Sequence, residues 1–268
     1  MPTTRRNLVR ILLCLCSVLM AGAACAQGFS ALVSPPRIED NAKAGATYRN
    51  VIEISNVSGQ AAHYTVKTAD WTLKADSTVV FSDALSTGSC RPWVGIEAPD
   101  IHVAANGKRR YRFEVAVPAD APNGECRFAI MIEGDPEPTK DAVALPVSGR
   151  IGVIIYLTVG DAVAKLDVVG RKVQAVDGRD VPVLSVRNSG GAHGRLQGFI
   201  DGKDASGRSY SFVPATLPIL AGETYDIALT PQGDNDDAPA PAIVYPLQLK
   251  GHLDSGAQRI DIEATFQK

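Results

Sequence analysis

The stretch YRNVIEISN (residues 48–56) alternates between two kinds of side chain. Its even-numbered positions include Ile52 and Ile54, whereas its odd-numbered positions include the charged Arg49 and Glu53. Successive side chains of a strand point to opposite faces of a sheet, so a period of two is typical of a half-buried β-strand. The stretch therefore predicts a strand with one face turned to a core.

The same alternation recurs along the first half of the chain, in AHYTVKTADWTL (62–73), KRRYRFEVAVP (108–118) and ECRFAIMIEG (125–134). Turn-forming residues separate these stretches, at Asn56 to Gly59, Asn106-Gly107, Asn123-Gly124 and Asp135-Pro136. No convincing helical periodicity occurs after residue 26. Short strands divided by Gly, Pro and Asn turns are typical of an antiparallel sandwich.

A second run of expected strands follows Gly160, in VPVLSVRNSGG (181–191), GRLQGFIDGKDASGRSYSF (194–212), GETYDIALTP (222–231), AIVYPLQLKGHLDSG (242–256) and QRIDIEATF (258–266). SN (55–56) and RN (187–188) each end an early strand of their half, although no sequence repeat is present. Each half has the size of an immunoglobulin-like sandwich. We therefore predict an all-β fold with two immunoglobulin-like β-sandwich domains, at residues 27–160 and 161–268.

The first 26 residues have the features of a Sec signal peptide. Arg5, Arg6 and Arg10 precede the apolar stretch 11–24, and the small residues Ala24 and Ala26 flank Cys25. We expect cleavage after Ala26, export to the periplasm and no stable membrane insertion, because the apolar stretch is shorter than the ~20 residues of a membrane span. Cleavage would remove three arginines and no acidic residue, so the net charge would fall from −2 to −5. This acidity argues against nucleic acid as a partner.

Two of the five cysteines, Cys90 and Cys126, lie outside the expected signal peptide. An even number of cysteines in an oxidising compartment favours a disulfide. The disulfide would close a loop of the unfolded chain and stabilise the folded state by roughly 3–4 kcal/mol. The alternative is a metal or redox pair, but the spacing is not that of a CxxC motif and no histidine lies near in sequence.

The sequence offers few groups for catalysis. Its four histidines are scattered, and neither HExxH nor GxSxG is present. NSGGAHG (188–194) is expected to form a turn with positive φ angles, and DGKDASG (201–207) a hairpin tip rather than a calcium loop. We therefore expect no enzyme, no metal site and no cofactor; a hydrolase with a site gathered from distant strands is the alternative.

The stretch DAVALPVSGRIGVIIYLTVG (141–160) is unusual because it carries no charge between Arg150 and Asp161. Val143, Leu145 and Val147 alternate with other residues in its first part, and Ile151 continues the same parity. Residues 151–157 are apolar on both faces, which is typical of a strand buried in a core. For residues 143–147 two interpretations remain, an edge strand available to a partner and another core strand.

The chain as a whole resembles the periplasmic pilus chaperones of the chaperone–usher system. The likeness is carried by ALVSPPRIE (31–39) followed by VIEISNVSG (51–59), by the succession of strands and turns in 91–132, by the segment 141–160, and by LSVRNSGGAHGRLQGFI (184–200) with LPILAGETYDIAL (217–229). The resemblance implies two immunoglobulin-like domains set at an angle. It also implies a chaperone that caps pilus or fimbrial subunits by donating a strand and delivers them to an outer-membrane usher.

The resemblance places Val143, Leu145 and Val147 at the donor positions, followed by Ile151. It places Arg37 where the family binds the carboxylate at a subunit's C-terminus; a plain surface charge is the alternative. The family's second basic residue falls on Gly152, so Arg150 is expected to replace it. Pro146 is a further departure, because it removes a backbone donor from the donating edge. The alternative function is a structural or adhesive immunoglobulin-like surface protein without a chaperone role.

Overall fold

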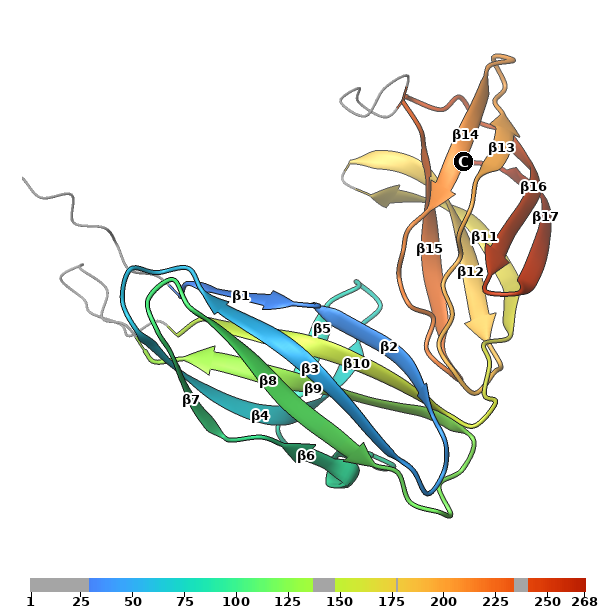
Figure 1. Ribbon diagram of the computed structural model, residues 1–268. Helices are drawn as coiled ribbons and strands as arrows, with labels where there is room; N and C mark the ends of the chain where they lie inside the picture. The colour runs from blue at the N-terminus through green and yellow to red at the C-terminus, as the bar shows by residue number, and fades with distance from the viewer. Residues whose placement is uncertain (1–28, 137–147, 177, 234–240) are drawn as a thin grey trace, which may run out of the picture.

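The computed structural model describes residues 29–136, 148–176, 178–233 and 241–268, and these form two β-sandwich domains set at an angle (Figure 1). Regular structure in these ranges is β-strand, apart from one turn of 3-10 helix, η1 (Arg91–Trp93). The all-β, two-sandwich prediction is confirmed. Among the described residues no helix is long and apolar enough to cross a membrane.

Strands from residues 31–159 build the first domain as two sheets. The first sheet has the order β1 (Ala31–Ser34), β3 (Thr47–Asn56), β8 (Lys108–Ala116), β6 (Val94–Ile96). The second has the order β2 (Arg37–Ala42), β10 (Arg150–Val159), β9 (Gly124–Gly134), β4 (Ala62–Leu73), β5 (Val79–Ser82), with β7 (Asp100–Val103) also paired to β4. Between them lies a core that includes Ile52, Phe128 and Ile155, each fully buried.

The N-terminal strand changes sheets at Pro35-Pro36. β1 pairs antiparallel with β3 in the first sheet, whereas β2 pairs parallel with β10 in the second. Proline has no backbone N–H to give to a ladder, so two prolines in a row interrupt pairing at this point. The register of β2 on β10 consequently begins only at the pair Arg37–Ile154.

The second domain is one sheet that curls back on itself. Its order is β11 (Leu166–Val176), β12 (Arg179–Asn188), β15 (Thr224–Pro231), β14 (Ser209–Pro214), β13 (Ile200–Lys203), β16 (Leu247–Ser255), β17 (Gln258–Phe266). The side chain of Gln258 donates to the carbonyl oxygen of Leu166 (2.7 Å) and accepts from its N–H (2.9 Å). These bonds join the first and last strands, and the enclosed core includes the buried Phe212 and Phe266.

The two asparagines that end an early strand have the same role in each domain. Asn188 is fully buried; its Oδ1 accepts from the N–H groups of Lys165 (3.1 Å) and Gly190 (2.9 Å), and its Nδ2 donates to the carbonyls of Ala192 and Ile219 (both 2.8 Å). Asn56 at the end of β3 likewise bonds backbone groups of several neighbouring turns. Each amide satisfies backbone groups that would otherwise be buried without partners.

The glycine-rich segment NSGGAHG is explained by close packing and not by positive φ angles, so that prediction was wrong. A Cβ on Gly190 would lie 2.3 Å from the carbonyl oxygen of Val163, and one on Gly194 would lie 2.7 Å from the Cβ of Ala164. The φ angles of these two glycines are not in the left-handed region. The expected hairpin tip at 201–207 is confirmed, since it joins β13 to β14 with Gly207 at φ 83°.

Candidate functional site

The first residues of β10 have a neighbouring strand on one side only. β9 pairs with β10 over the whole range Arg150–Val159, whereas β2 pairs with it only from Ile154 onward. Within the described part of the chain, Arg150–Val153 therefore present an open edge. Unpaired N–H and C=O groups along such an edge are a template for a further strand.

The side chains of β10 alternate between the core of the first domain and the face turned toward the second domain. Ile151 packs against the core, and Val153 is fully buried in it. Arg150 and Gly152 have the opposite parity, shared with Tyr156. Three of the predicted donor residues, Val143, Leu145 and Val147, lie outside the described residues, as does Pro146.

The side chain of Phe29 packs against Gly134 and Gly149, which lie on either side of residues 137–147 in the sequence. A Cβ on Gly149 would lie 2.2 Å from the Cβ of Phe29, and one on Gly134 would lie 2.8 Å from its Cδ2. Phe29 also meets Tyr64 edge-on at 6.0 Å between ring centroids. The N–H of Gly134 donates to the carbonyl of Gly149 (3.1 Å), and the hydroxyl of Ser148 donates to the carbonyl of Gly134 (2.6 Å).

Gly152 has no space for the basic side chain that the family pattern expects. A Cβ at this position would lie 2.6 Å from Cζ of Phe81 and 3.1 Å from Sδ of Met131. Phe81 belongs to β5, which pairs with β4, and its ring reaches over the sheet to Gly152. A lysine here would have to displace that ring.

Arg150 lies near other charged groups on this face. Lys67 bonds Asp83 (2.9 Å) and lowers the pKa of that carboxyl, to which the positive charges of Arg91 and Arg150 also contribute. Arg150 itself is exposed and directly opposite Glu133 on β9. Arg37 lies elsewhere on the same sheet face, opposite Ile154. Among the described contacts, Arg37 and Arg150 therefore share no common partner.

Arg37 belongs to a polar cluster at the contact between the domains. Its Nε lies 2.7 Å from Oε1 of Glu39, and Nη1 of Arg195, from the second domain, lies 2.6 Å from the same oxygen. His193 joins the cluster through Arg195 and through Glu125 on β9. Sequence reasoning missed Glu39, Glu125, His193 and Arg195, because they come from three distant parts of the chain.

An apolar contact beside this cluster joins the domains. Leu220 and Tyr225 of the second domain pack with Trp71 and Tyr156 of the first. The hydroxyl of Tyr225 donates to the carbonyl of Leu73 (3.1 Å). Burial raises the pKa of Tyr156 to about 12, so its hydroxyl stays neutral at physiological pH.

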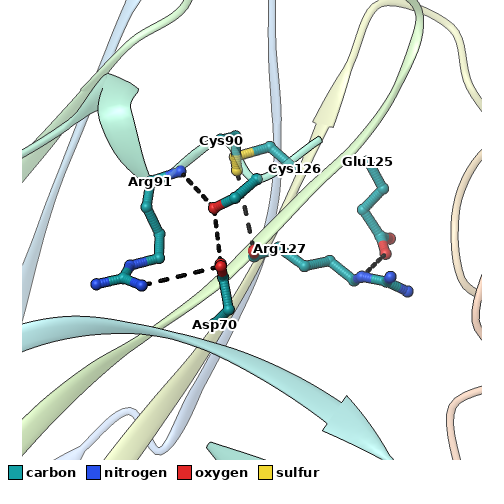
Figure 2. Close-up of a disulfide and its surroundings, with 7 residues drawn as sticks. Asp70, Cys90, Arg91, Glu125, Cys126 and Arg127 are labelled. Atoms are coloured by element: carbon teal, nitrogen blue, oxygen red, sulfur yellow. Dashed lines mark hydrogen bonds and ion pairs between the residues drawn. A yellow bond between two sulfur atoms is a disulfide. The ribbon is translucent and has the colours of Figure 1, made fainter. Parts of the chain in front are cut away.

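The predicted disulfide is present between Cys90 and Cys126, with Cα atoms 5.6 Å apart (Figure 2). Asp70 supports the Cys90 side by accepting from the N–H of Ser86 (2.6 Å) and the hydroxyl of Ser89 (2.7 Å). On the other side of the bond, the neighbours of Cys126 in β9 face the second domain.

Those two neighbours are Glu125, which contacts His193, and Arg127, whose guanidinium lies 5.7 Å from the ring centroid of Trp71. The disulfide thus lies directly beneath residues of the domain contact. No group of three or more His, Cys, Asp or Glu side chains suited to a metal ion occurs among the residues that the structure describes.

No protein-family model matches the sequence, and no curated protein matches it. Solved structures do align with the chain. CfaA, a class 5 fimbriae chaperone, aligns at 11% identity and a TM-score of 0.47, over 89% of this chain and 100% of CfaA.

Two further alignments involve complexes. A chain of the CsuC–CsuE chaperone–tip adhesion subunit complex, from the archaic chaperone–usher Csu pili of Acinetobacter baumannii, aligns at 15% identity and a TM-score of 0.46, over 89% of this chain and 100% of that one. A chain of the Salmonella enterica SafA pilin–SafB chaperone complex aligns at 14% identity and a TM-score of 0.45, over 89% and 98%. Fimbrial chaperones are thus among the solved structures that this chain resembles over most of its length.

Proposed function

We propose that this protein is a periplasmic chaperone that binds fimbrial subunits along the open edge of β10 and delivers them to an outer-membrane usher. Residues 1–26 would be removed after Ala26, and residues 27–160 and 161–268 would act as the two domains. The observation that carries the proposal is the edge at Arg150–Val153, which has β9 on one side and no described strand on the other. This edge directly follows the alternating residues 143–147.

Strand addition supplies the binding energy in this mechanism. A subunit that lacks a strand exposes a hydrophobic groove between unpaired backbone groups, and the donated edge provides both hydrogen bonds and apolar side chains. Val143, Leu145 and Val147 would enter the groove, each contributing roughly 1.5–3 kcal/mol before the cost of ordering. Ile151 continues the row where the edge joins the core of the first domain.

Arg37 is proposed to bind the carboxylate at the subunit's C-terminus, with Arg150 as the second basic group. The Nε of Arg37 is taken by Glu39, so the Nη groups are the donors left to face a partner. A planar guanidinium can hold a carboxylate through two parallel hydrogen bonds. About half of the Arg37 side chain is exposed, which leaves it accessible to a partner.

Co-expression with a fimbrial subunit tests the strand-donation step. We expect a triple variant with Val143→Glu, Leu145→Glu and Val147→Glu to lose the subunit, because a desolvated carboxylate in an apolar groove opposes binding. The readout is the amount of intact subunit that co-purifies with the tagged chaperone from the periplasm.

The matched control carries the same three charges at exposed apolar positions elsewhere, as Leu85→Glu, Val163→Glu and Val169→Glu. It should retain the subunit. If the triple variant at 143–147 retained as much subunit as the wild type, strand donation by this segment would be wrong.

A further inference from the structure

A continuous series of polar contacts runs from the buried domain contact to Arg37. The backbone N–H of His193 donates to Oε2 of Glu125 (3.0 Å), and its ring Nδ1 contacts the same oxygen. Nη1 of Arg195 lies 2.8 Å from Nε2 of His193 and 2.6 Å from Oε1 of Glu39. Nε of Arg37 lies 2.7 Å from that same Glu39 oxygen. The five residues come from three separate parts of the chain.

The hydrogen-bond directions follow from the chemistry of the partners. A guanidinium can only donate, so Nε2 of His193 is the acceptor in its 2.8 Å hydrogen bond with Nη1 of Arg195. A carboxylate can only accept, so Nδ1 is the donor in its hydrogen bond with Oε2 of Glu125. His193 thus joins Glu125 to Arg195 through one contact at each ring nitrogen.

The series is rigid at one end and accessible at the other. The Glu125 side chain is 2% exposed and that of Arg195 is 11% exposed, whereas that of Arg37 is 53% exposed. The ring of Tyr156 packs on His193 at 3.9 Å between centroids, and Arg195 lies 5.5 Å from the Tyr156 ring centroid. Packing thus fixes Arg195, while nothing comparable packs on Arg37 among the described contacts.

We infer that Arg195 is a positioning residue: through Glu39, it holds the guanidinium of Arg37 in the orientation that receives the carboxylate of a bound subunit. The inference rests on the proposed function. Without Arg195, Glu39 would keep its bond to Arg37 but would lose its shorter link to the second domain, leaving the 3.5 Å contact with Nε2 of His193, and Arg37 would sample more rotamers. A donor that is not pre-oriented loses conformational entropy on binding and binds more weakly.

Two synthetic peptides can separate this role from a general effect on folding. Both are an alternating Val-Thr strand of about ten residues, one with a free C-terminal carboxylate and the other with a C-terminal amide. Calorimetry gives the ratio of their dissociation constants. We expect the wild-type protein to prefer the carboxylate by about tenfold, the size of one charge-assisted hydrogen bond.

The Arg195→Gln variant should reduce this preference to about threefold, and Arg37→Ala should reduce it further, to what Arg150 alone supports. Arg195→Gln added to Arg37→Ala should have no further effect on the ratio, because the two residues act through one group. A merely structural role for Arg195 would weaken both peptides alike and leave the ratio unchanged. Arg259→Gln, which removes an exposed ion-paired arginine from the second domain, is the control and should keep the wild-type ratio.

The outcomes distinguish the inference from the proposed function. If Arg37→Ala lowered the preference but Arg195→Gln left it at the wild-type value, the positioning role would be overturned and the carboxylate site would stand. If the wild type showed no preference, or Arg37→Ala did not change it, the carboxylate-binding role of Arg37 would fail, and the inference with it.

Discussion

Gly152→Lys restores the basic residue that the chaperone pattern expects, and we predict that it destabilises the first domain. The new Cβ would lie 2.6 Å and 2.9 Å from two atoms of the Phe81 ring and 3.1 Å from Sδ of Met131. Overpacking of this kind costs about 1–3 kcal/mol. Replacing a strand glycine returns about 0.5–1 kcal/mol, because the unfolded chain becomes less flexible. The middles of these two ranges differ by about 1 kcal/mol, which is the net loss that we expect.

Thermal unfolding followed by circular dichroism measures this loss. In a domain of about 130 residues, 1 kcal/mol corresponds to roughly 4 °C, so Tm should fall by about 4 °C. Phe81→Ala opens the space above Gly152, and Gly152→Lys should cost little or nothing in that background. The strong coupling between the two substitutions is the specific signature of the contact.

Gly59→Lys is the matched control, since a Cβ on Gly59 meets no atom within 4 Å. It should leave Tm nearly unchanged. The reasoning would be refuted if Gly152→Lys were as stable as the wild type, or if Phe81→Ala failed to relieve its cost.

Three further predictions concern the stability of the two domains. Replacing Cys90 and Cys126 by alanine should lower the free energy of unfolding of the first domain by about 4 kcal/mol, because the disulfide closes a loop of 36 residues in the unfolded chain. Urea unfolding measures this loss, and a value below about 1 kcal/mol would contradict the prediction. The hydrogen bond to Asp135 raises the pKa of His63 above 6.5. The contribution of this hydrogen bond to the stability of the folded state is therefore full below pH 6.5 and is lost as pH rises through the raised pKa. His63→Asn should therefore lower Tm at about pH 5.5 but not at about pH 8.5, and an equal loss at both would exclude this origin. Asn188→Ala leaves four backbone groups without their partner and should lower the free energy of unfolding of the second domain by about 3 kcal/mol, as measured by urea unfolding. A loss below about 1 kcal/mol would show that water replaces the amide.

Strands with regular alternation could be predicted from the sequence alone. The stretches 48–56 and 62–73 correspond to β3 and β4 within one residue, because a period of two is a local property that burial of one face enforces. β11 was not predicted. A register shift between Val168 and Gly170 breaks its alternation, so its apolar residues do not follow one parity.

The polar cluster between the domains could not be predicted in the same way. Glu39 and Arg195 are separated by 156 residues, and the contact between them depends on how two complete domains pack. The absence of a basic residue at position 152 was visible in the sequence. Its cause was not, because Phe81 approaches from a strand in a distant part of the same sheet.

The packing of Phe29 against Gly134 and Gly149 has a consequence for which residues these two positions tolerate. A Cβ on either glycine would lie within 3 Å of the Phe29 side chain, although neither glycine has a φ angle in the left-handed region. The need for glycine at both positions is therefore steric. A smaller residue at position 29 would release both positions at once, so the three residues are coupled although they lie far apart in the sequence.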